Sequence, residues 1–323
     1  MRRLTIILLA VMLIVLCSCE LTVKAPGPGR MHILVYGNDY RYGTRYYYED
    51  GSFAGTAQSL SGTVNDAYQV GLALCSLARK AGYEYEGIFM TGTESRSVSD
   101  PNISVIKSVY KSDFISVLDT LAKKVESSDI TIIYFSGHGM GGDEKLEYGS
   151  DTSKTSYMAL RRDVDFSSSI LYPLNEFLAK VETIPGTKVI LGDFCHSGGM
   201  VRAGNVSITS GEYDGIDATT LLTEYRNDIC ESSSVFCLSA ARYYERSHEP
   251  GGGLHGYFTR ALLEGLGWDE ESQSLTKAEA MVNNRITLFN LAKYTTDNDN
   301  EKPGDPQTPM TSGGSNDIIL FSF

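Results

Sequence analysis

The chain has 323 residues, with 28 basic and 40 acidic side chains and a formal net charge of −12 at pH 7. Hydrophobic residues make up 42% of it, which is enough for a globular core and excludes global disorder. The acidic balance excludes the basic surface stripe of a nucleic-acid-binding protein, so we expect no nucleic-acid partner. The length allows one large domain or two small ones.

The N-terminus has the pattern of a secretory signal. Arg2 and Arg3 precede an apolar run at 4–16, and small or polar residues follow that run. The run is 13 residues long, which is shorter than the ~20 residues that a membrane-spanning helix needs. We therefore expect residues 1–18 to be a signal peptide that is removed on export.

The signal ends in Leu-Cys-Ser-Cys, which resembles the box of a bacterial lipoprotein. In this interpretation Cys19 is lipidated and becomes the new N-terminus, and 19–30 is a short tether whose Pro and Gly residues exclude a helix. An ordinary cleaved signal, an uncleaved anchor and modification at Cys17 are the alternatives. The prediction is an exported protein of the bacterial cell envelope, lipid-anchored to the membrane.

Short apolar runs and amphipathic stretches alternate from residue 31 to the end of the chain. The predicted strands are 31–37, 87–91, 129–135, 187–191, 234–240 and 316–321. The predicted helices are one that Asn65 or Asp66 caps and that runs to Leu77, one that Ser112 and Asp113 cap and that runs to Val125, and 172–181, 257–266 and 277–292. The stretches 40–48, 140–169, 200–227 and 298–315 are predicted loops. This alternation predicts one α/β domain over 31–323 with a mainly parallel sheet.

Two segments each carry one reactive side chain directly after a predicted strand. His138 stands between Gly137 and Gly139, and Cys195 lies in Gly-Asp-Phe-Cys-His-Ser-Gly-Gly. Since the carboxyl ends of parallel strands meet at one edge of a sheet, we expect the imidazole and the thiol to lie side by side. The thiolate is the nucleophilic form, and a nearby imidazole lowers the thiol pKa. The pair is the minimum equipment of a cysteine hydrolase.

The remaining histidines and cysteines have plainer interpretations. His196 is a rival base, but neighbouring side chains diverge in an extended chain, so we expect it to point away from Cys195. No compact C-x-x-C or H-E-x-x-H spacing occurs, so we predict no metal site. Cys75 and Cys237 fall in apolar patterns and are expected to be small buried side chains. A disulfide between Cys230 and Cys237 stays open.

The motifs S-G-H-G at 136–139 and D-x-C-H-S-G at 193–198 resemble the paired active-site motifs of the caspase-like cysteine peptidases, especially the metacaspase and paracaspase branch. The resemblance extends over roughly 31–323. It includes N-D-A at 65–67, S-A-A-R at 239–242 and G-Y-F-T-R-A-L-L-E-G-L at 256–266. The form Q-A-C-R-G does not occur, which favours the metacaspase branch. The resemblance implies a caspase-like α/β fold with a mainly parallel central sheet flanked by helices.

The resemblance also implies roles for individual residues. Cys195 would attack a peptide carbonyl, His138 would protonate the leaving amine, and the backbone N–H groups of Gly139 and Cys195 would hold the oxyanion. Asp193 lies on the same strand face as the nucleophile and, by analogy with metacaspases, would line a pocket that selects Lys or Arg. A capping or structural carboxylate is the alternative for Asp193. Ser239 is a further implied substrate-binding residue.

Two stretches depart from the metacaspase pattern. Tyr243 stands where the first acid of a D-x-Q-T-S-x-D arrangement is usual, while Glu249 falls at the position of its last acid. Glu249 is predicted either to share the substrate-binding pocket or to be surface charge. The acidic run that accompanies calcium activation in many metacaspases is reduced to Asp143, Glu144 and Asp151. The sequence thus predicts no cofactor and gives calcium activation little support.

The predicted function is that of a cysteine endopeptidase that cuts peptide or protein substrates after Arg or Lys. A catalytically silent caspase-fold binding module on the cell envelope is one alternative. A thiol transpeptidase with the same dyad is another, because an amine can resolve an acyl-enzyme as water does. The predicted loop at 200–227 contains Arg202 and Arg226, so self-cleavage and an intact loop both stay open.

Overall fold

A seven-stranded sheet forms the centre of the protein. The computed structural model describes residues 29–92, 98–141, 156–164, 167–203, 234–251, 254–299, 306–311 and 318–323. The strands of the central sheet are β1 (Met31–Gly37), β4 (Tyr85–Met90), β5 (Ile103–Ile106), β6 (Ile130–Ser136), β10 (Thr187–Asp193), β11 (Val235–Ser239) and β15 (Met310–Thr311). Their order is β15-β11-β10-β6-β1-β4-β5, and every pair except β11–β15 is parallel. This confirms the predicted α/β fold with a mainly parallel sheet.

The three middle strands β1, β6 and β10 are apolar along both faces because helices cover the sheet on both sides. All seven residues of β1 are buried, as are six of the seven in β6 and in β10. Their register places Gly37, Ser136 and Asp193 in one row at the carboxyl ends. The residues that follow these strands therefore start from a common edge.

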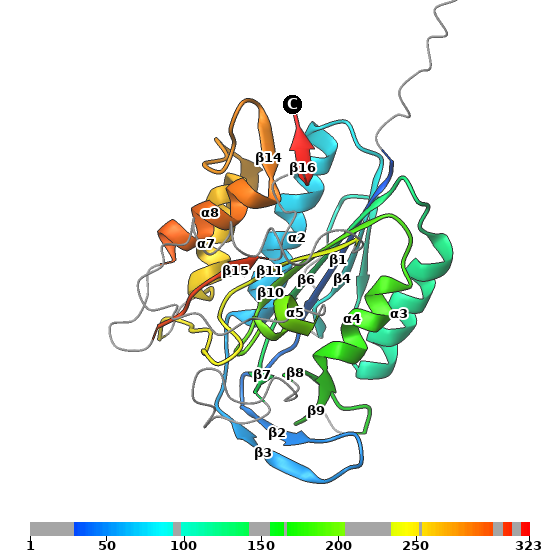
Figure 1. Ribbon diagram of the computed structural model, residues 1–323, viewed down its shortest axis with the longest axis vertical. Helices are drawn as coiled ribbons and strands as arrows, with labels where there is room; N and C mark the ends of the chain where they lie inside the picture. The colour runs from blue at the N-terminus through cyan, green and yellow to red at the C-terminus, as the bar shows by residue number, and fades with distance from the viewer. Residues whose placement is uncertain are drawn as a thin grey trace, which may run out of the picture.

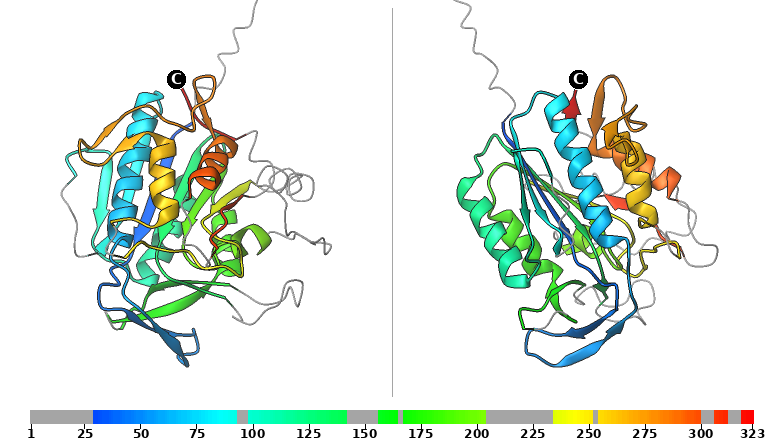
Figure 2. Two further views of the ribbon diagram at one scale, coloured as in Figure 1. Left: turned by 90° about the vertical axis from the view of Figure 1, so that its left-hand side faces the viewer. Right: turned by 180° about the vertical axis from the view of Figure 1, so that it is seen from behind.

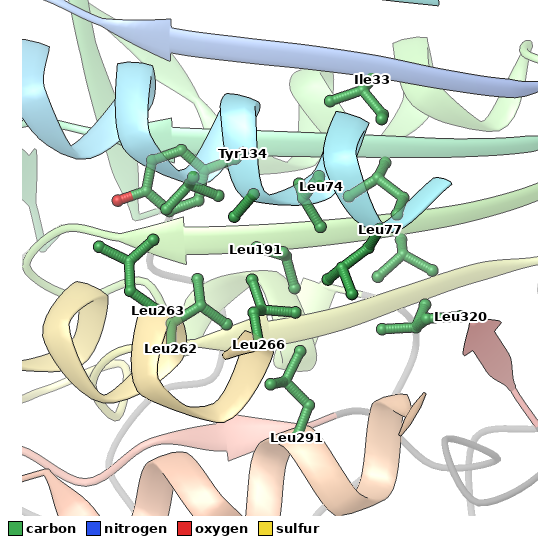
Figure 3. Close-up of a cluster of buried hydrophobic side chains, with 14 of the residues drawn as sticks. Ile33, Leu74, Leu77, Tyr134, Leu191, Leu262, Leu263, Leu266, Leu291 and Leu320 are labelled. Carbon is green, nitrogen blue, oxygen red and sulfur yellow. The ribbon is translucent and has the colours of Figure 1, made fainter. Parts of the chain in front are cut away.

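Two helix layers sandwich the sheet, as Figures 1 and 2 show. One layer holds α2 (Thr63–Lys80), α7 (Tyr257–Leu266) and α8 (Leu288–Asn298), and the other holds α3 (Lys111–Lys124) and α4 (Leu174–Glu182). Figure 3 shows the core under the first layer, where leucines of α2, α7 and α8 meet Ile33, Tyr134 and Leu191 of the sheet. A second core cluster fills the space between the sheet and the other layer.

A smaller five-stranded sheet lies at the carboxyl-end side of the central sheet (Figure 1). Its order is β3-β2-β9-β8-β7, and its strands are β2 (Thr44–Tyr47), β3 (Phe53–Ala57), β7 (Gly139–Met140), β8 (Tyr157–Arg161) and β9 (Ser168–Pro173). This corrects two predicted loops, at 40–48 and at 140–169. Alternate side chains of β2 are buried, and Tyr46 packs with Ala159 and Leu171 in a small core of their own.

The helix predicted at 277–292 is wrong. Asn283 and Asn284 have φ of 51° and 59°, a left-handed conformation that a helix cannot continue through. The chain instead forms β14 (Arg285–Thr287), which pairs with β16 (Ile319–Ser322), and α8 starts at Leu288. The predicted caps are also two to four residues late, because Gly62 and Tyr110 precede the first turns of α2 and α3.

The predicted bounds of β1 and α7 are confirmed, whereas β15 lies within the loop predicted at 298–315 and a short helix overlaps the start of the loop predicted at 200–227. Cys75 and Cys237 are buried in α2 and β11, as expected. Three small elements complete the description: α5 (Gly199–Ala203), β12 (Trp268–Asp269) and β13 (Ser274–Leu275). Cys17, Cys19 and Cys230 lie outside the described residues. Within the described ranges, no helix has the length and apolar character needed to cross a membrane.

Candidate active site

A cavity of about 870 Å³ opens at the carboxyl ends of β6 and β10. Segments from several parts of the chain line it, including the stretch that follows β3, the stretch that follows β6, and 246–251. The lining side chains that carry chemistry are Asp66, Ser136, His138, Asp193, Cys195, Arg246, Ser247, His248 and Glu249. The structure therefore brings the two residues of the predicted dyad to one cavity.

Backbone contacts between the two strand ends hold the dyad residues in place. Gly137 N–H donates to the Asp193 carbonyl at 3.1 Å, which extends the pairing of β6 and β10 past their last register pair. Gly139 packs so closely that a Cβ built there would lie 2.0 Å from the Cys195 carbonyl oxygen. Only glycine permits this approach. The glycine after His138 is thus needed to bring the two segments together.

His138 is an oriented, neutral imidazole. Its Nε2 lies 2.9 Å from the Gln58 carbonyl oxygen, which can only accept, so Nε2 carries the proton. The rings of Tyr40 and Tyr46 pack edge-on against the imidazole at centroid distances of 4.6 and 5.9 Å. Burial lowers the pKa of His138 to about 4, despite the opposing effect of the Gln58 contact. Nδ1 is then the nitrogen that can exchange a proton with a thiol.

Cys195 is a protonated thiol at rest. Its Sγ donates to the Ser247 carbonyl oxygen at 3.6 Å. Burial raises the pKa of the thiol, and it outweighs the Ser247 contact and the charge of Arg246, which lower that pKa. Both members of the dyad are therefore neutral before a ligand enters.

The backbone N–H of Gly139 is directed away from strand β8. Ala159 N–H donates to the His138 carbonyl at 3.0 Å, and Gly139 is paired with Met158 in the antiparallel ladder of β7 and β8. Hydrogen-bonded and non-hydrogen-bonded pairs alternate along such a ladder. The Gly139–Met158 pair is thus of the second kind, and the Gly139 N–H points away from β8. The oxyanion roles of Gly139 and Cys195 stay predictions.

His196 lies in a turn and not in the extended segment that the sequence argument assumes, and it does not line the cavity. It has φ of 61°, and its Nδ1 lies 2.8 Å from the Tyr243 carbonyl oxygen. Its backbone N–H donates to the Glu245 carbonyl at 2.8 Å. These contacts fix the turn after Cys195 against the loop that begins after β11.

Asp193 lines the cavity with a carboxylate that is already hydrogen-bonded. Oδ1 accepts from the Ser247 hydroxyl at 2.5 Å, while Oδ2 accepts from the Thr259 hydroxyl at 2.5 Å and from the Thr259 N–H at 3.2 Å. Thr259 is in the first turn of α7, whose N-terminus favours negative charge. Burial raises the Asp193 pKa, and these three donors oppose that rise.

Asp66 is the site residue that the sequence argument missed. It was assigned to a helix cap, but it lies inside the first turn of α2, it is 2% exposed, and it lines the cavity. Its Oδ2 accepts from the Ser136 hydroxyl at 2.7 Å. Burial raises its pKa to about 7. The available signal was position, since α2 starts at the same sheet edge as the dyad.

The other two predicted substrate-binding residues differ in outcome. Glu249 lines the cavity, but its carboxylate accepts from Ser61 N–H, Ser61 Oγ and Gly62 N–H at 3.2, 2.8 and 3.1 Å. It holds the segment before α2 against the cavity rim. Ser239 is fully buried, does not line the cavity, and donates to the carbonyls of Ala241 and Met310. The prediction that Ser239 binds substrate is therefore not supported by its position.

No group of three or more His, Cys, Asp or Glu side chains within the described ranges is arranged to hold a metal ion. Asp143, Glu144 and Asp151 lie outside these ranges. The described site consists of a neutral thiol–imidazole pair that lines a cavity together with several carboxylates.

Comparison with known proteins places the chain in a family. Residues 44–314 match the caspase domain. Metacaspase-6 of Arabidopsis thaliana is 28% identical over 189 residues, which cover 56% of this chain and 46% of that protein. Metacaspase-7 of the same plant is 27% identical over 154 residues, which cover 46% and 34%. The chain thus spans less than half the length of these curated relatives.

A solved crystal structure of a Geobacter sulfurreducens protein aligns over 88% of this chain and 93% of its own, with 14% identity and a TM-score of 0.46. The family assignment depends instead on the caspase-domain match, which covers most of the chain. The protein belongs to the caspase domain family of peptidases and is distantly related to the plant metacaspases.

Proposed function

We propose that the protein is a cysteine endopeptidase that cuts after Arg or Lys. The observation that carries this proposal is that Cys195 and His138 line the same cavity as three carboxylates, those of Asp66, Asp193 and Glu249. Nucleophile, base and a negatively charged pocket are thus within reach of one bound peptide. The family supports peptide substrates, and the pocket charge supports the choice of a basic side chain.

The reaction follows from the protonation states at rest. His138 Nδ1 takes the proton from the Cys195 thiol as Sγ bonds to the peptide carbonyl carbon. The carbonyl oxygen becomes an oxyanion, which the N–H groups of Gly139 and Cys195 stabilise. The C–N bond then breaks, and the imidazolium gives its proton to the leaving amine. Water hydrolyses the thioester and restores the thiol.

The basic preference rests on burial. Asp66 and Asp193 are 2% and 5% exposed, and a charge interaction is much stronger at such a site than in water. Arg246 is the one basic side chain besides histidine among the described lining residues. An Arg or Lys side chain of the substrate would thus enter a cavity with excess negative charge.

The direct test is cleavage of fluorogenic peptides that end in Arg, Lys, Asp or norleucine by the full chain, with and without calcium. We expect cleavage of the first two, and loss by a factor of about 10³ or more in Cys195→Ala and in His138→Ala. Added amine acceptors, followed by mass spectrometry, distinguish a transpeptidase. Binding of the peptides by the folded protein without cleavage indicates a binding module.

Export and a lipid anchor at Cys19 are a second part of the proposal, supported by the sequence pattern at the N-terminus. We expect the protein to incorporate a radiolabelled fatty acid and to sediment with membranes in a bacterial host. Cys19→Ser is expected to abolish the label, while Cys17→Ser retains it. Label that persists in Cys19→Ser would contradict this assignment.

A further inference from the structure

Three ionisable side chains are connected in a row that begins at Asp66 in the cavity and ends at the partly exposed Glu270. Asp66 Oδ1 lies 2.7 Å from His255 Nδ1, and His255 Nε2 lies 2.6 Å from Glu270 Oε2. Asp66 lines the cavity, but His255 and Glu270 do not. The side chains of the three are 2%, 12% and 32% exposed. His255 is therefore shielded from the substrate by the carboxylate that it contacts.

With both carboxyl groups ionised, the geometry requires a charged imidazole. Each ring nitrogen of His255 faces a carboxylate oxygen, and a carboxylate can only accept. Both contacts are hydrogen bonds only if both nitrogens carry a proton. The two carboxylates also raise the pKa of His255, against the effect of burial. Asp66, His255 and Glu270 then carry charges of −1, +1 and −1.

Neutral donors fix Glu270 in this arrangement. Its Oε1 accepts from Asn65 Nδ2 at 2.9 Å and from Gln69 Nε2 at 3.0 Å, both on α2. Gln69 Oε1 in turn accepts from the Trp268 indole N–H at 2.9 Å. The far end of the row is therefore held by α2 and by the segment after α7.

We propose that His255, held by Glu270, is a positioning residue that keeps Asp66 ionised and aimed into the cavity, and so sets its preference for a cationic side chain. The proposal rests on the proposed function above. Without His255 the buried Asp66 is favoured in its neutral form, because burial and the like charge of Asp193 in the same cavity both disfavour ionisation. The cavity then loses one of its two deeply buried negative charges.

Among the described residues, the charges that act most strongly on Asp66 are those of His255 and Asp193. Asp193 on β10 raises the Asp66 pKa, and Glu249 raises that of Asp193. The Ser136 hydroxyl on β6 and His255 act in the opposite direction on Asp66. His255 is the cation among these contributions, so its removal has the largest expected effect on the Asp66 charge.

The test measures binding without turnover. In a Cys195→Ala background of the full chain, calorimetry at pH 7 compares an Arg-ended peptide with the citrulline-ended peptide, which has the same shape and no charge. We expect His255→Gln to weaken binding of the Arg-ended peptide about fivefold or more, because a rise of one unit in the Asp66 pKa from about 7 lowers its ionised fraction at pH 7 from about one half to about one tenth. Binding of the citrulline-ended peptide is expected to stay unchanged. In the active enzyme, KM for Arg-ended substrates rises while kcat is retained.

A matched control is available at the other end of β1. His32 is also buried between two carboxylates, with Nδ1 2.8 Å from Glu86 and Nε2 3.1 Å from Asp129, but it does not line the cavity. His32→Gln is expected to leave unchanged the ratio of the affinities for the Arg-ended and citrulline-ended peptides (the Arg-to-citrulline ratio). If His255→Gln does not fold, Glu270→Gln provides the same comparison with a smaller expected loss.

A second readout is independent of any peptide. Nitrogen-15 NMR of the histidine side chains is expected to show His255 as an imidazolium at pH 7. In Asp66→Asn the His255 ring is expected to lose its proton at a lower pH than in the wild type. A neutral His255 at pH 7, or an unchanged Arg-to-citrulline ratio in His255→Gln, would overturn the proposal. If the wild-type protein does not cleave after Arg or Lys, this result would instead contradict the proposed function.

Discussion

At the scale of single residues, burial keeps both Cys195 and His138 in their neutral forms. It lowers the His138 pKa to about 4 and raises that of the Cys195 thiol. The thiol hydrogen is directed to the Ser247 carbonyl. In the proposed reaction, a bound peptide would displace this contact, and the thiolate would form only as the carbonyl is attacked. The proposed dyad would thus be activated by its substrate.

The pH dependence of kcat/KM is expected to differ between basic and neutral substrates. The Asp66 pKa is about 7, so the carboxyl gains a proton and loses its charge as the pH falls through 7. Cleavage of an Arg-ended peptide should therefore decline below about pH 7. A norleucine-ended peptide should decline only as His138 is protonated near pH 4. Parallel pH–rate profiles of both peptides measure this difference.

Asp66→Asn is the control for this pH dependence. The variant has no carboxyl to titrate, so its Arg-ended peptide profile is expected to be flat around pH 7 and low throughout. A decline near pH 7 that persists in Asp66→Asn would assign the titration to another group.

Asp193→Asn is expected to weaken the binding free energy of an Arg-ended substrate by about 2–5 kcal/mol, because the substitution removes one partner of a buried charge pair. Glu249→Gln is expected to have a smaller effect, since Glu249 is less buried than Asp193 and water screens its charge more strongly. KM for Arg-ended and norleucine-ended peptides provides the measurement. Equal losses in the two variants, or equal losses for the two peptides, would contradict the assignment of Asp193 to the basic pocket.

Sequence reasoning located the residues that follow their own strand and missed those that other elements supply. His138, Asp193 and Cys195 stand at strand ends within recognisable motifs, and they line the cavity. Asp66 is far from them in sequence, and its helix-cap interpretation was equally consistent with the pattern. Ser239 shows the reverse case, because a motif position does not determine which way a side chain at a strand end points.

At the scale of elements, the start of α7 holds the Asp193 carboxylate that lines the cavity. Its N-cap is Gly256, and its third residue, Thr259, donates both N–H and hydroxyl to Asp193. The helix N-terminus and the carboxylate stabilise each other. The strand that precedes Cys195, β10, is thereby connected to the helix layer through Asp193.

Gly256→Ala is expected to disturb this pocket. A Cβ at this position would lie 2.4 Å from Asp193 Oδ2 and must displace it. We expect KM for Arg-ended peptides to rise with little change in the cleavage of a norleucine-ended peptide. Circular dichroism checks that the variant is folded. An unaltered KM would show that Asp193 can move without consequence for the binding of basic substrates.

Element prediction worked where burial on both sides dictated the pattern. The middle strands and α7 are strongly apolar and were predicted from sequence. The strands β2 and β8 belong to the small sheet, whose polar and tyrosine-rich segments carry a weak pattern. The false helix at 277–292 had apolar residues at helical spacing, but two successive left-handed asparagines interrupt it.

At the scale of the whole molecule, the segment between α5 and β11 separates two paired strands. Residues 204–233 connect them and lie outside the described residues. On either side of this segment, β10 and β11 are parallel neighbours from Lys188↔Val235 to Gly192↔Ser239. The two parts of the chain therefore share one sheet and one core.

Cleavage within 204–233 is expected to leave the two fragments associated. The pairing of β10 with β11 and the packing of α7 against the sheet persist after the cut. Denaturing electrophoresis should show two bands, while size-exclusion chromatography shows a single species of unchanged size. Limited trypsin treatment of Cys195→Ala supplies the cut without self-processing. Separate elution of the fragments would contradict this prediction.

The hydrogen bond from the Cys195 thiol to Ser247 also bears on how long the protein survives. Peroxides and alkylating agents attack thiolates and spare thiols, and sulfinic or sulfonic acid is not reduced back. A thiol that is kept protonated is therefore less reactive toward oxidants than a thiolate. For an exported peptidase, as proposed above, oxidative damage to Cys195 would then accumulate with use and not with age.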